Sequence, residues 1–179
     1  MRIPRGFSDN YDGQERRHES WHDVAQICTN GHVINRSSKK YPQHNNDFCD
    51  KCGQRTLTKC EKCGGDIRGE YHVEGVASFG GDFPAPAFCV QCGSPFPWTV
   101  SRLQAARELA AEMEELTEEE RESLSRSLDD LIRDTPQTTV SVSRFKKVAK
   151  KISKEGLSGL REILIDIVSE TAKKSIWPT

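Results

Sequence analysis

Six of the seven cysteines form three Cys-x-x-Cys-Gly units, at residues 49–53, 60–64 and 89–93. Two thiolates separated by two residues can bind one tetrahedral ion from a tight turn. The glycine that follows allows the positive φ with which such a turn closes. No apolar signal segment opens the chain, so we expect a cytoplasmic protein in a reducing compartment. The cysteines therefore predict structural zinc rather than disulfides.

The remaining cysteine completes the set of ligands. Cys28 precedes the turn dipeptide Asn30-Gly31 and then His32, so a thiolate and an imidazole can face the same ion. Eight ligands are enough for two closed tetrahedral sites, and we expect two structural zinc ions. In sequence order, the predicted ligands are Cys28, His32, Cys49 and Cys52 for the first zinc and Cys60, Cys63, Cys89 and Cys92 for the second.

Two alternatives to this assignment stay open. His44, in the polar segment Tyr-Pro-Gln-His-Asn-Asn, could replace His32. However, no cysteine lies close enough to it in the sequence to form a zinc knuckle, the tight turn that presents two ligands to one ion. The ligand pairs could also interleave in a cross-brace, as in RING-like ubiquitin-ligase modules. We favour the sequential arrangement, two tandem zinc ribbons. A cross-brace usually brings its middle ligands closer together than the gap between Cys52 and Cys60 allows.

A competing zinc signature lies just before these ligands. Residues 18–22, His-Glu-Ser-Trp-His, spell the His-Glu-x-x-His motif of metalloproteases. That motif acts from a helix and needs a third ligand and a substrate cleft. Residues 1–17 contain no strand pattern that could form the cleft, and Cys28 follows too soon for the helix to continue. We interpret the motif as a coincidence, and we expect neither enzyme activity nor a small-molecule substrate.

The composition changes along the chain. Residues 1–20 are polar and predict a mobile N-terminal arm. Residues 21–98 hold every cysteine and short β-like runs, which predicts tandem zinc ribbons at 21–57 and 58–98. Residues 99–179 lack cysteine and carry helical periodicity, which predicts three to four helices. The expected fold class is α+β, a small tandem zinc-ribbon β-hairpin domain followed by an all-α region.

Capping signals and glycines divide the expected helical region. Ser101 and Thr117 each begin a capping-box pattern. Gly156 and Gly159 are expected to interrupt the helical structure before a last apolar stripe, at residues 160–172. Such stripes are typical of the core face of a small helical bundle.

The chain contains the segments CTNGHVIN, FCDKCG, CEKCGGDIRG, PAFCVQCGSPFPW and RFKKVAKKISKEGLSGLREILIDIVSETAKKSIW. Together they resemble a bacterial family of unknown function that is built on tandem zinc ribbons with an appended helical region. The resemblance spans about residues 21–177. It implies bacterial origin and zinc binding by the ligands named above, and it implies no activity.

Charge is distributed unevenly along the helical region. Residues 101–135 carry five arginines and eleven acidic residues, whereas residues 136–179 carry nine basic and four acidic residues. The two halves could neutralise each other within a bundle. The basic segment 144–154 could instead contact a nucleic-acid backbone, and a helix at 144–176 could associate with a membrane surface.

Among these readings we favour a non-enzymatic interaction or adaptor protein with an unknown protein partner. Residues 1–100 are formally neutral, with twelve basic and twelve acidic residues. Zinc held by thiolates carries a net charge of about −1 to −2 per site. The loaded ribbons would then be an unfavourable surface for phosphates.

Overall fold

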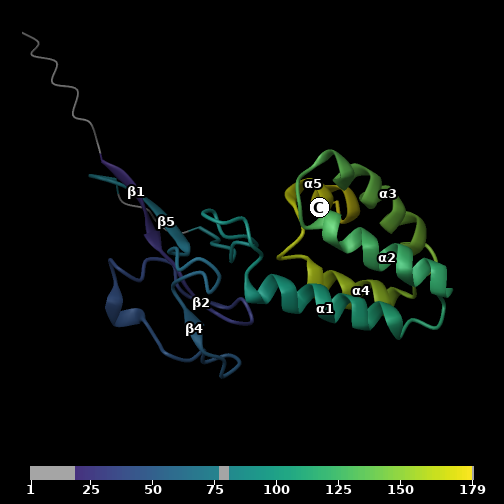
Figure 1. Ribbon diagram of the computed structural model, residues 1–179, viewed down its shortest axis with the longest axis horizontal. Coiled ribbons are helices and arrows are strands. Elements are labelled where there is room, and N and C mark those ends of the chain that lie inside the picture. Colours follow the sequence, from purple (N-terminus) through teal and green to yellow (C-terminus); the bar gives the residue numbers. More distant parts are fainter. Residues whose placement is uncertain (1–18, 77–80, 179) are drawn as a thin grey trace, which may run out of the picture.

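A computed structural model describes residues 19–76 and 81–178 of the chain (Figure 1). Small β-sheets come first and a helical region follows, so the predicted fold class is confirmed. The predicted arm at 1–20 lies outside the described residues except for Glu19 and Ser20. The boundaries predicted at 57 and 98 remain predictions.

The described strands form two small antiparallel sheets. They are β1 (Ser20–Val24), β2 (Gln26–Cys28), β3 (Val33–Asn35), β4 (Thr56–Leu57) and β5 (Arg68–Val73), with a short 3-10 helix, η1 (Pro42–His44), before β4. β2 lies between β3 and β4 in one sheet, and β1 pairs with β5 in the other. Because β1 and β2 are almost contiguous in the chain, they connect the two sheets.

Backbone pairing crosses from the first predicted ribbon to the second. β5 follows Cys63 in the chain and pairs with β1, which precedes Cys28. Immediately beside this pair, the amide of Ala25 donates to the carbonyl of Ile67 at 2.9 Å. The strands that belong to different cysteine units are therefore joined to one another by backbone hydrogen bonds.

A small apolar core lies beside the cysteines. Its buried residues in the described chain are Ala25, Ile27, Cys60, Ile67, Cys89, Phe96 and Trp98. Phe96 and Trp98 stack with 4.6 Å between ring centroids, and the Trp98 Nε1 donates to the Pro86 carbonyl at 2.8 Å. The residues at the start of the first helix thus complete the core of the portion that holds the β-sheets and the cysteines, which we call the β part.

The described residues form five helices, and not the three to four that we predicted. They are α1 (Pro97–Ala111), α2 (Glu118–Leu131), α3 (Pro136–Ala149), α4 (Lys154–Leu164) and α5 (Glu170–Ile176). The predicted interruption at Gly156 and Gly159 is wrong, because both lie inside α4. The break comes later, where the Ser169 hydroxyl accepts from the Ala172 amide at 3.2 Å and caps α5.

The two predicted capping boxes have different outcomes. Thr117 caps α2 as predicted, and its hydroxyl accepts from the Glu120 amide while the Glu120 carboxylate accepts from the Thr117 amide. Ser101 instead lies inside α1, which begins at Pro97. Proline is favoured at the first helical position, because its fixed φ suits a helix and its missing N–H needs no partner there.

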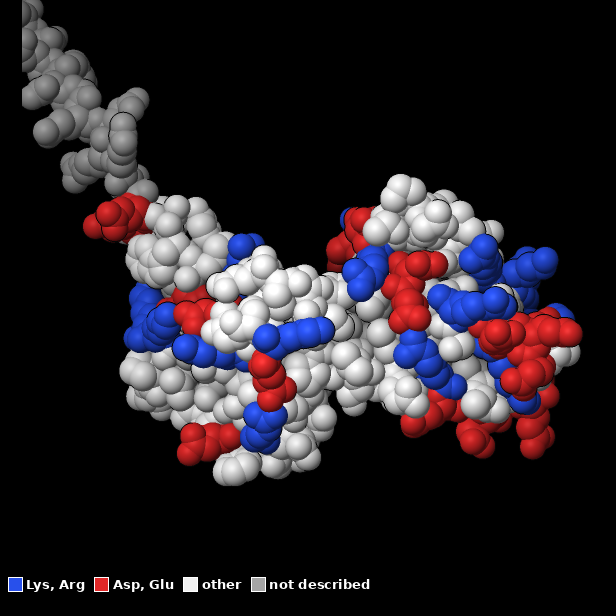
Figure 2. All heavy atoms as spheres, viewed as in Figure 1, with Lys and Arg blue, Asp and Glu red and all other residues white. Residues whose placement is uncertain are grey.

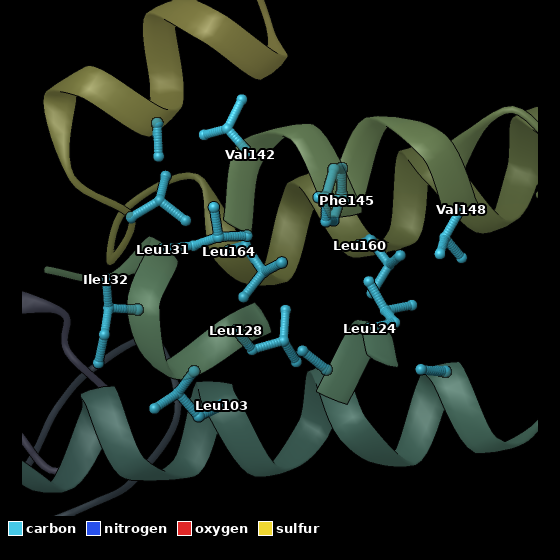
Figure 3. Close-up of a cluster of buried hydrophobic side chains, with 14 of the residues drawn as sticks. Leu103, Leu124, Leu128, Leu131, Ile132, Val142, Phe145, Val148, Leu160 and Leu164 are labelled. Carbon is cyan, nitrogen blue, oxygen red and sulfur yellow. The ribbon is translucent and has the colours of Figure 1, made fainter. Parts of the chain in front are cut away.

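The helices pack into a bundle with a core of its own (Figure 3). α1 packs against α4 and α2, α2 against α3, and α3 against α5. Leu124, Leu128, Phe145, Leu160 and Leu164 point inward and are at most 1% exposed. Full burial of each such side chain contributes about 1.5–3 kcal/mol, so the bundle is stabilised without the cysteines.

Besides the hydrogen bond from Trp98 to Pro86, further side-chain contacts attach the bundle to the β part. The Thr99 hydroxyl donates to the Ala87 carbonyl at 2.8 Å. The Arg133 guanidinium lies over the Phe88 ring, 4.9 Å from its centroid.

In the described residues, no helix combines the length with the apolar character that crossing a bilayer would require.

Candidate metal centres

Two groups of four metal-binding side chains gather in the described residues. Cluster 1 is Cys28, His32, Cys49 and Cys52, and cluster 2 is Cys60, Cys63, Cys89 and Cys92. Within each cluster, the donor atoms all lie within 4.8 Å of one another. The structure thus brings together the eight predicted ligands, in sequence order and without interleaving. His44 is in neither cluster; it lies in η1, with its ring 6.4 Å from that of Tyr41.

The three Cys-x-x-Cys-Gly units have the same backbone geometry. Gly53, Gly64 and Gly93 have φ of 69°, 74° and 68°, and each amide donates to the carbonyl of the first cysteine of its unit at 2.8 Å. That φ is strained for a residue with a Cβ atom, which accounts for the glycine at this position. An isolated antiparallel bridge flanks each unit, as between Phe48 and Arg55. The repeated sequence therefore folds as a repeated turn that directs two sulfurs to one side.

The fourth donor pair comes from a different turn. The Cys28 amide donates to the His32 carbonyl at 3.0 Å, and the His32 amide approaches the Cys28 sulfur at 3.3 Å. Gly31 allows the turn with a φ of 89°. The turn connects β2 to β3, so the sheet determines where the His32 imidazole points.

The distances within each cluster fit a tetrahedral ion. With Zn–S bonds of about 2.3 Å, the sulfurs around a tetrahedral zinc lie about 3.8 Å apart. The observed Sγ–Sγ distances are 3.8 Å for Cys28–Cys52, 3.8 Å for Cys60–Cys92 and 3.7 Å for Cys63–Cys89. A disulfide would place the sulfurs about 2.05 Å apart. The cysteines are thus free thiols spaced as ligands.

The histidine of cluster 1 meets the same test. The His32 Nδ1 lies 3.5 Å from the sulfur of Cys28 and 3.5 Å from that of Cys49. With a Zn–N bond of about 2.0–2.1 Å, the corresponding edge of a tetrahedron is about 3.5 Å. The Nδ1 nitrogen is therefore the one that faces the position of an ion.

Local hydrogen bonds lower the pKa of one cysteine in each cluster and so favour its thiolate form. The backbone amide of Gln54 lowers the pKa of Cys52 to about 6. The side chain and then the backbone of Ser94 lower the pKa of Cys92 to about 6. Burial, in contrast, raises the pKa of Cys28. Metals bind the thiolate form, so the residues that follow the knuckles at 49–52 and 89–92 favour the protonation state that a metal needs. No pattern in the sequence had indicated a role for Gln54 or Ser94.

The clusters differ in exposure. The first cysteine of each knuckle, at 49, 60 and 89, is buried. Cys52 of cluster 1 is partly buried, whereas Cys63 and Cys92 of cluster 2 are exposed. Cluster 2 is therefore the more accessible of the two to solvent reagents.

The His-Glu-x-x-His segment lies partly outside the described residues, which exclude His18. His22 lies in β1, in extended backbone, and its Nδ1 is 3.2 Å from the Gly69 carbonyl. The metalloprotease motif places its two histidines one turn apart on a helix. The strand at 20–24 does not provide that arrangement.

The sequence patterns also gave no indication of a buried polar network near β5. Asp23 accepts from the amides of Lys39 and Lys40 at 3.0 and 3.1 Å. Ser37 lies with its hydroxyl 3.1 Å from the His72 Nε2, but it is only 1% exposed. The network connects β1 and β5 to the turn that follows β3. No local pattern predicts it, because these partners lie 16 to 49 residues apart.

A model of the family described as "Uncharacterized protein conserved in bacteria (DUF2321)" matches residues 21–176. The match covers most of the chain and confirms the family predicted from its segments. No curated protein and no solved structure matches the chain.

Proposed function

Since the chain belongs to this uncharacterised bacterial family, we propose that it is a non-enzymatic adaptor protein whose two clusters bind structural zinc. The β part then serves as a rigid support, and the attached helical bundle meets a protein partner in the cytoplasm. Two features of the chain, the donor sets and the division of the core, support the proposal.

The closed donor sets carry the proposal. Each cluster brings four donors within 4.8 Å of one another, and the sulfur–sulfur distances of 3.7–3.8 Å match the edge of a tetrahedron around zinc. A tetrahedral ion with four protein ligands has no position for a water or a substrate. Thiolates and imidazole are donors that suit zinc. Zinc bound there supplies cross-links, and catalysis by a metal-bound water has no place to occur.

The division of the core supports a structural role for the metal. The buried core of the β part is small, and it includes two of the ligands, Cys60 and Cys89. A core of this size stabilises a domain poorly. Binding of a structural zinc contributes on the order of 10 kcal/mol to folding, which is enough to offset the deficit.

The metal content tests the structural role. We predict two zinc ions per chain by elemental analysis of the purified protein. After substitution with Co²⁺, both sites should give absorption typical of tetrahedral thiolate coordination. Cys52→Ser should reduce the content to one ion, and Lys51→Ala, beside it in the same knuckle, should leave two. One ion or none in the native protein would contradict the proposal.

Affinity capture tests the adaptor role. The zinc-loaded protein should retain a protein partner after nuclease treatment and after detergent removal of membranes. Capture that disappears with nuclease would favour the nucleic-acid alternative through residues 144–154. Capture that requires intact vesicles would favour membrane association through residues 144–176.

A further inference from the structure

A groove with an apolar floor lies between α3, α4 and α5. Its floor is formed by the partly buried side chains of Ala149, Leu157, Ile176 and Trp177. Phe145 lies beneath them, with its ring 6.0 Å from that of Trp177 in an edge-on arrangement. The volume of the groove is about 550 Å³, which lies within the range of about 300–1,000 Å³ that is usual for binding sites.

Four cations surround this floor. Lys146, Lys150, Lys154 and Arg161 line the groove and are exposed, and no acidic residue of the described chain lines it. None of the four has an ion-pair partner among residues 19–76 and 81–178. Within the part of the chain that the structure describes, the positive charge of the rim is therefore not paired with acidic side chains.

Several other cations of the bundle do have acidic partners. Arg102 pairs with Asp166 and Arg107 with Asp129, each at 2.7 Å, and Lys151 pairs with Glu120. Figure 2 shows basic side chains at the upper right of the helical part, with acidic ones directly below them and along its lower edge. Ion pairs in the folded bundle thus neutralise only part of the charge difference between the acidic segment 101–135 and the basic segment 136–179. The cations at the rim of the groove are among those that stay unpaired in the described part of the chain.

A second copy of this chain fits the groove poorly. The most acidic segment, residues 112–122, has the complementary charge. Its apolar side chains are not available, because Met113 is 5% exposed and Leu116 is 3% exposed. An occupant has to bring both acidic groups and exposed apolar side chains.

A bilayer and a nucleic acid also fit poorly. The floor residues are recessed, whereas a membrane surface requires apolar side chains that protrude into it. In the described part of α3, α4 and α5, the large exposed apolar residue is Val140, which does not line the groove. A phosphate backbone would match the rim but would leave the apolar floor unfilled.

We propose that the groove between α3, α4 and α5 binds an amphipathic helix with acidic flanks, presented by a partner protein. Apolar side chains at positions i, i+3 or i+4, and i+7 of such a helix would fill the floor. Its flanking carboxylates would face Lys146, Lys150, Lys154 and Arg161. An extended peptide would find no backbone partners there, because the groove is walled by helices whose backbone groups bond internally. The inference rests on the proposed adaptor function and adds the site and the chemistry of the partner.

Peptide binding to the zinc-loaded full chain tests the inference. The probe is a fluorescein-labelled peptide of about 14 residues with leucines at those helical positions and glutamates on both flanks. We expect binding that weakens as salt is raised, because the rim is exposed and salt screens it. The same peptide with glutamine in place of glutamate should bind about tenfold more weakly.

Matched charge reversals locate the site. Lys146→Glu with Lys150→Glu should weaken peptide binding about tenfold. Arg144→Glu with Lys147→Glu makes the same charge change on the same helix, at exposed residues outside the groove, and should change it less than about twofold. Leu157→Gln tests the floor and should also weaken binding. Circular dichroism and zinc content should be unchanged in all of them.

Three outcomes would overturn the inference. A zinc-loaded chain that does not bind the peptide removes the groove as a helix site, while the adaptor proposal stands on its own capture test. Equal losses in both double variants would indicate general attraction between charges. Tighter binding to duplex DNA or to phosphatidylglycerol vesicles than to the peptide would assign the cations to a nucleic acid or to a membrane. If zinc is absent but the peptide binds, the structural role of the clusters fails and the groove remains.

Discussion

At the scale of single residues, close backbone approach explains positions that the ligand pattern does not. A Cβ atom at Gly69 would lie 2.4 Å from the Arg36 carbonyl oxygen and 2.7 Å from that of Asp23. Both neighbours are backbone atoms of the turn and strand that β5 packs on, so they cannot move like a flexible side chain. Glycine at 69 thus allows β5 to join the two cysteine units.

We predict that Gly69→Ala destabilises the β part by roughly 1–3 kcal/mol, as expected for overpacking. Gly81→Ala is the control, because a Cβ atom there meets nothing within 4 Å. Thermal unfolding with zinc release as the readout measures the effect. Equal stability of the two variants would mean that β5 shifts without cost.

At the scale of elements, helix ends depend on more than a spacing rule. Ser101 and Thr117 have the same sequence pattern, but only Thr117 caps a helix. Pro97 starts α1 four residues earlier and carries Ser101 into its interior. At Thr117, Lys151 and then the Thr117 amide lower the pKa of Glu120, so the capping carboxylate is ionised at neutral pH.

Thr117→Ala is expected to destabilise the bundle by about 1 kcal/mol, because the Glu120 amide loses its acceptor. Thr117→Ser retains the hydroxyl and should remain close to the native protein. Urea unfolding followed by far-ultraviolet circular dichroism gives the difference. A loss as large in the serine variant would point to packing of the threonine methyl group as the cause.

At the scale of the whole molecule, stability has two sources. The bundle buries Leu128, Leu131, Leu160 and Leu164 completely, and it contains none of the metal-binding residues. The β part has a smaller apolar core that includes Trp98, and it holds clusters 1 and 2. Apolar burial therefore stabilises the bundle, whereas under our proposal the β part also needs metal.

Removal of zinc by a chelator should unfold the β part and leave most helical signal intact. Trp98, now 1% exposed, should become accessible to a fluorescence quencher. Chelator saturated with zinc beforehand is the control. Loss of all helicity would show that the bundle needs the metal, and an unchanged quenching profile would show that the β part does not.

The sequence by itself determined the features that depend on neighbouring residues. The knuckle turns span five residues, the Cys28–His32 turn also spans five, and the Thr117 box spans four. Such features form wherever the local residues favour them, because their hydrogen bonds close within one turn. The composition also separated the β part from the helices, since periodicity is a local property.

Tertiary structure alone decided what joins distant segments. The pairing of β1 with β5 joins residues such as Ser20 and Val73, and the Asp23 and His72 network connects comparably distant positions. Whether a cation is paired also depends on which helix faces it, so the unpaired rim of the groove could not be identified from charge counts. These contacts depend on how whole surfaces meet, and no local spacing encodes that.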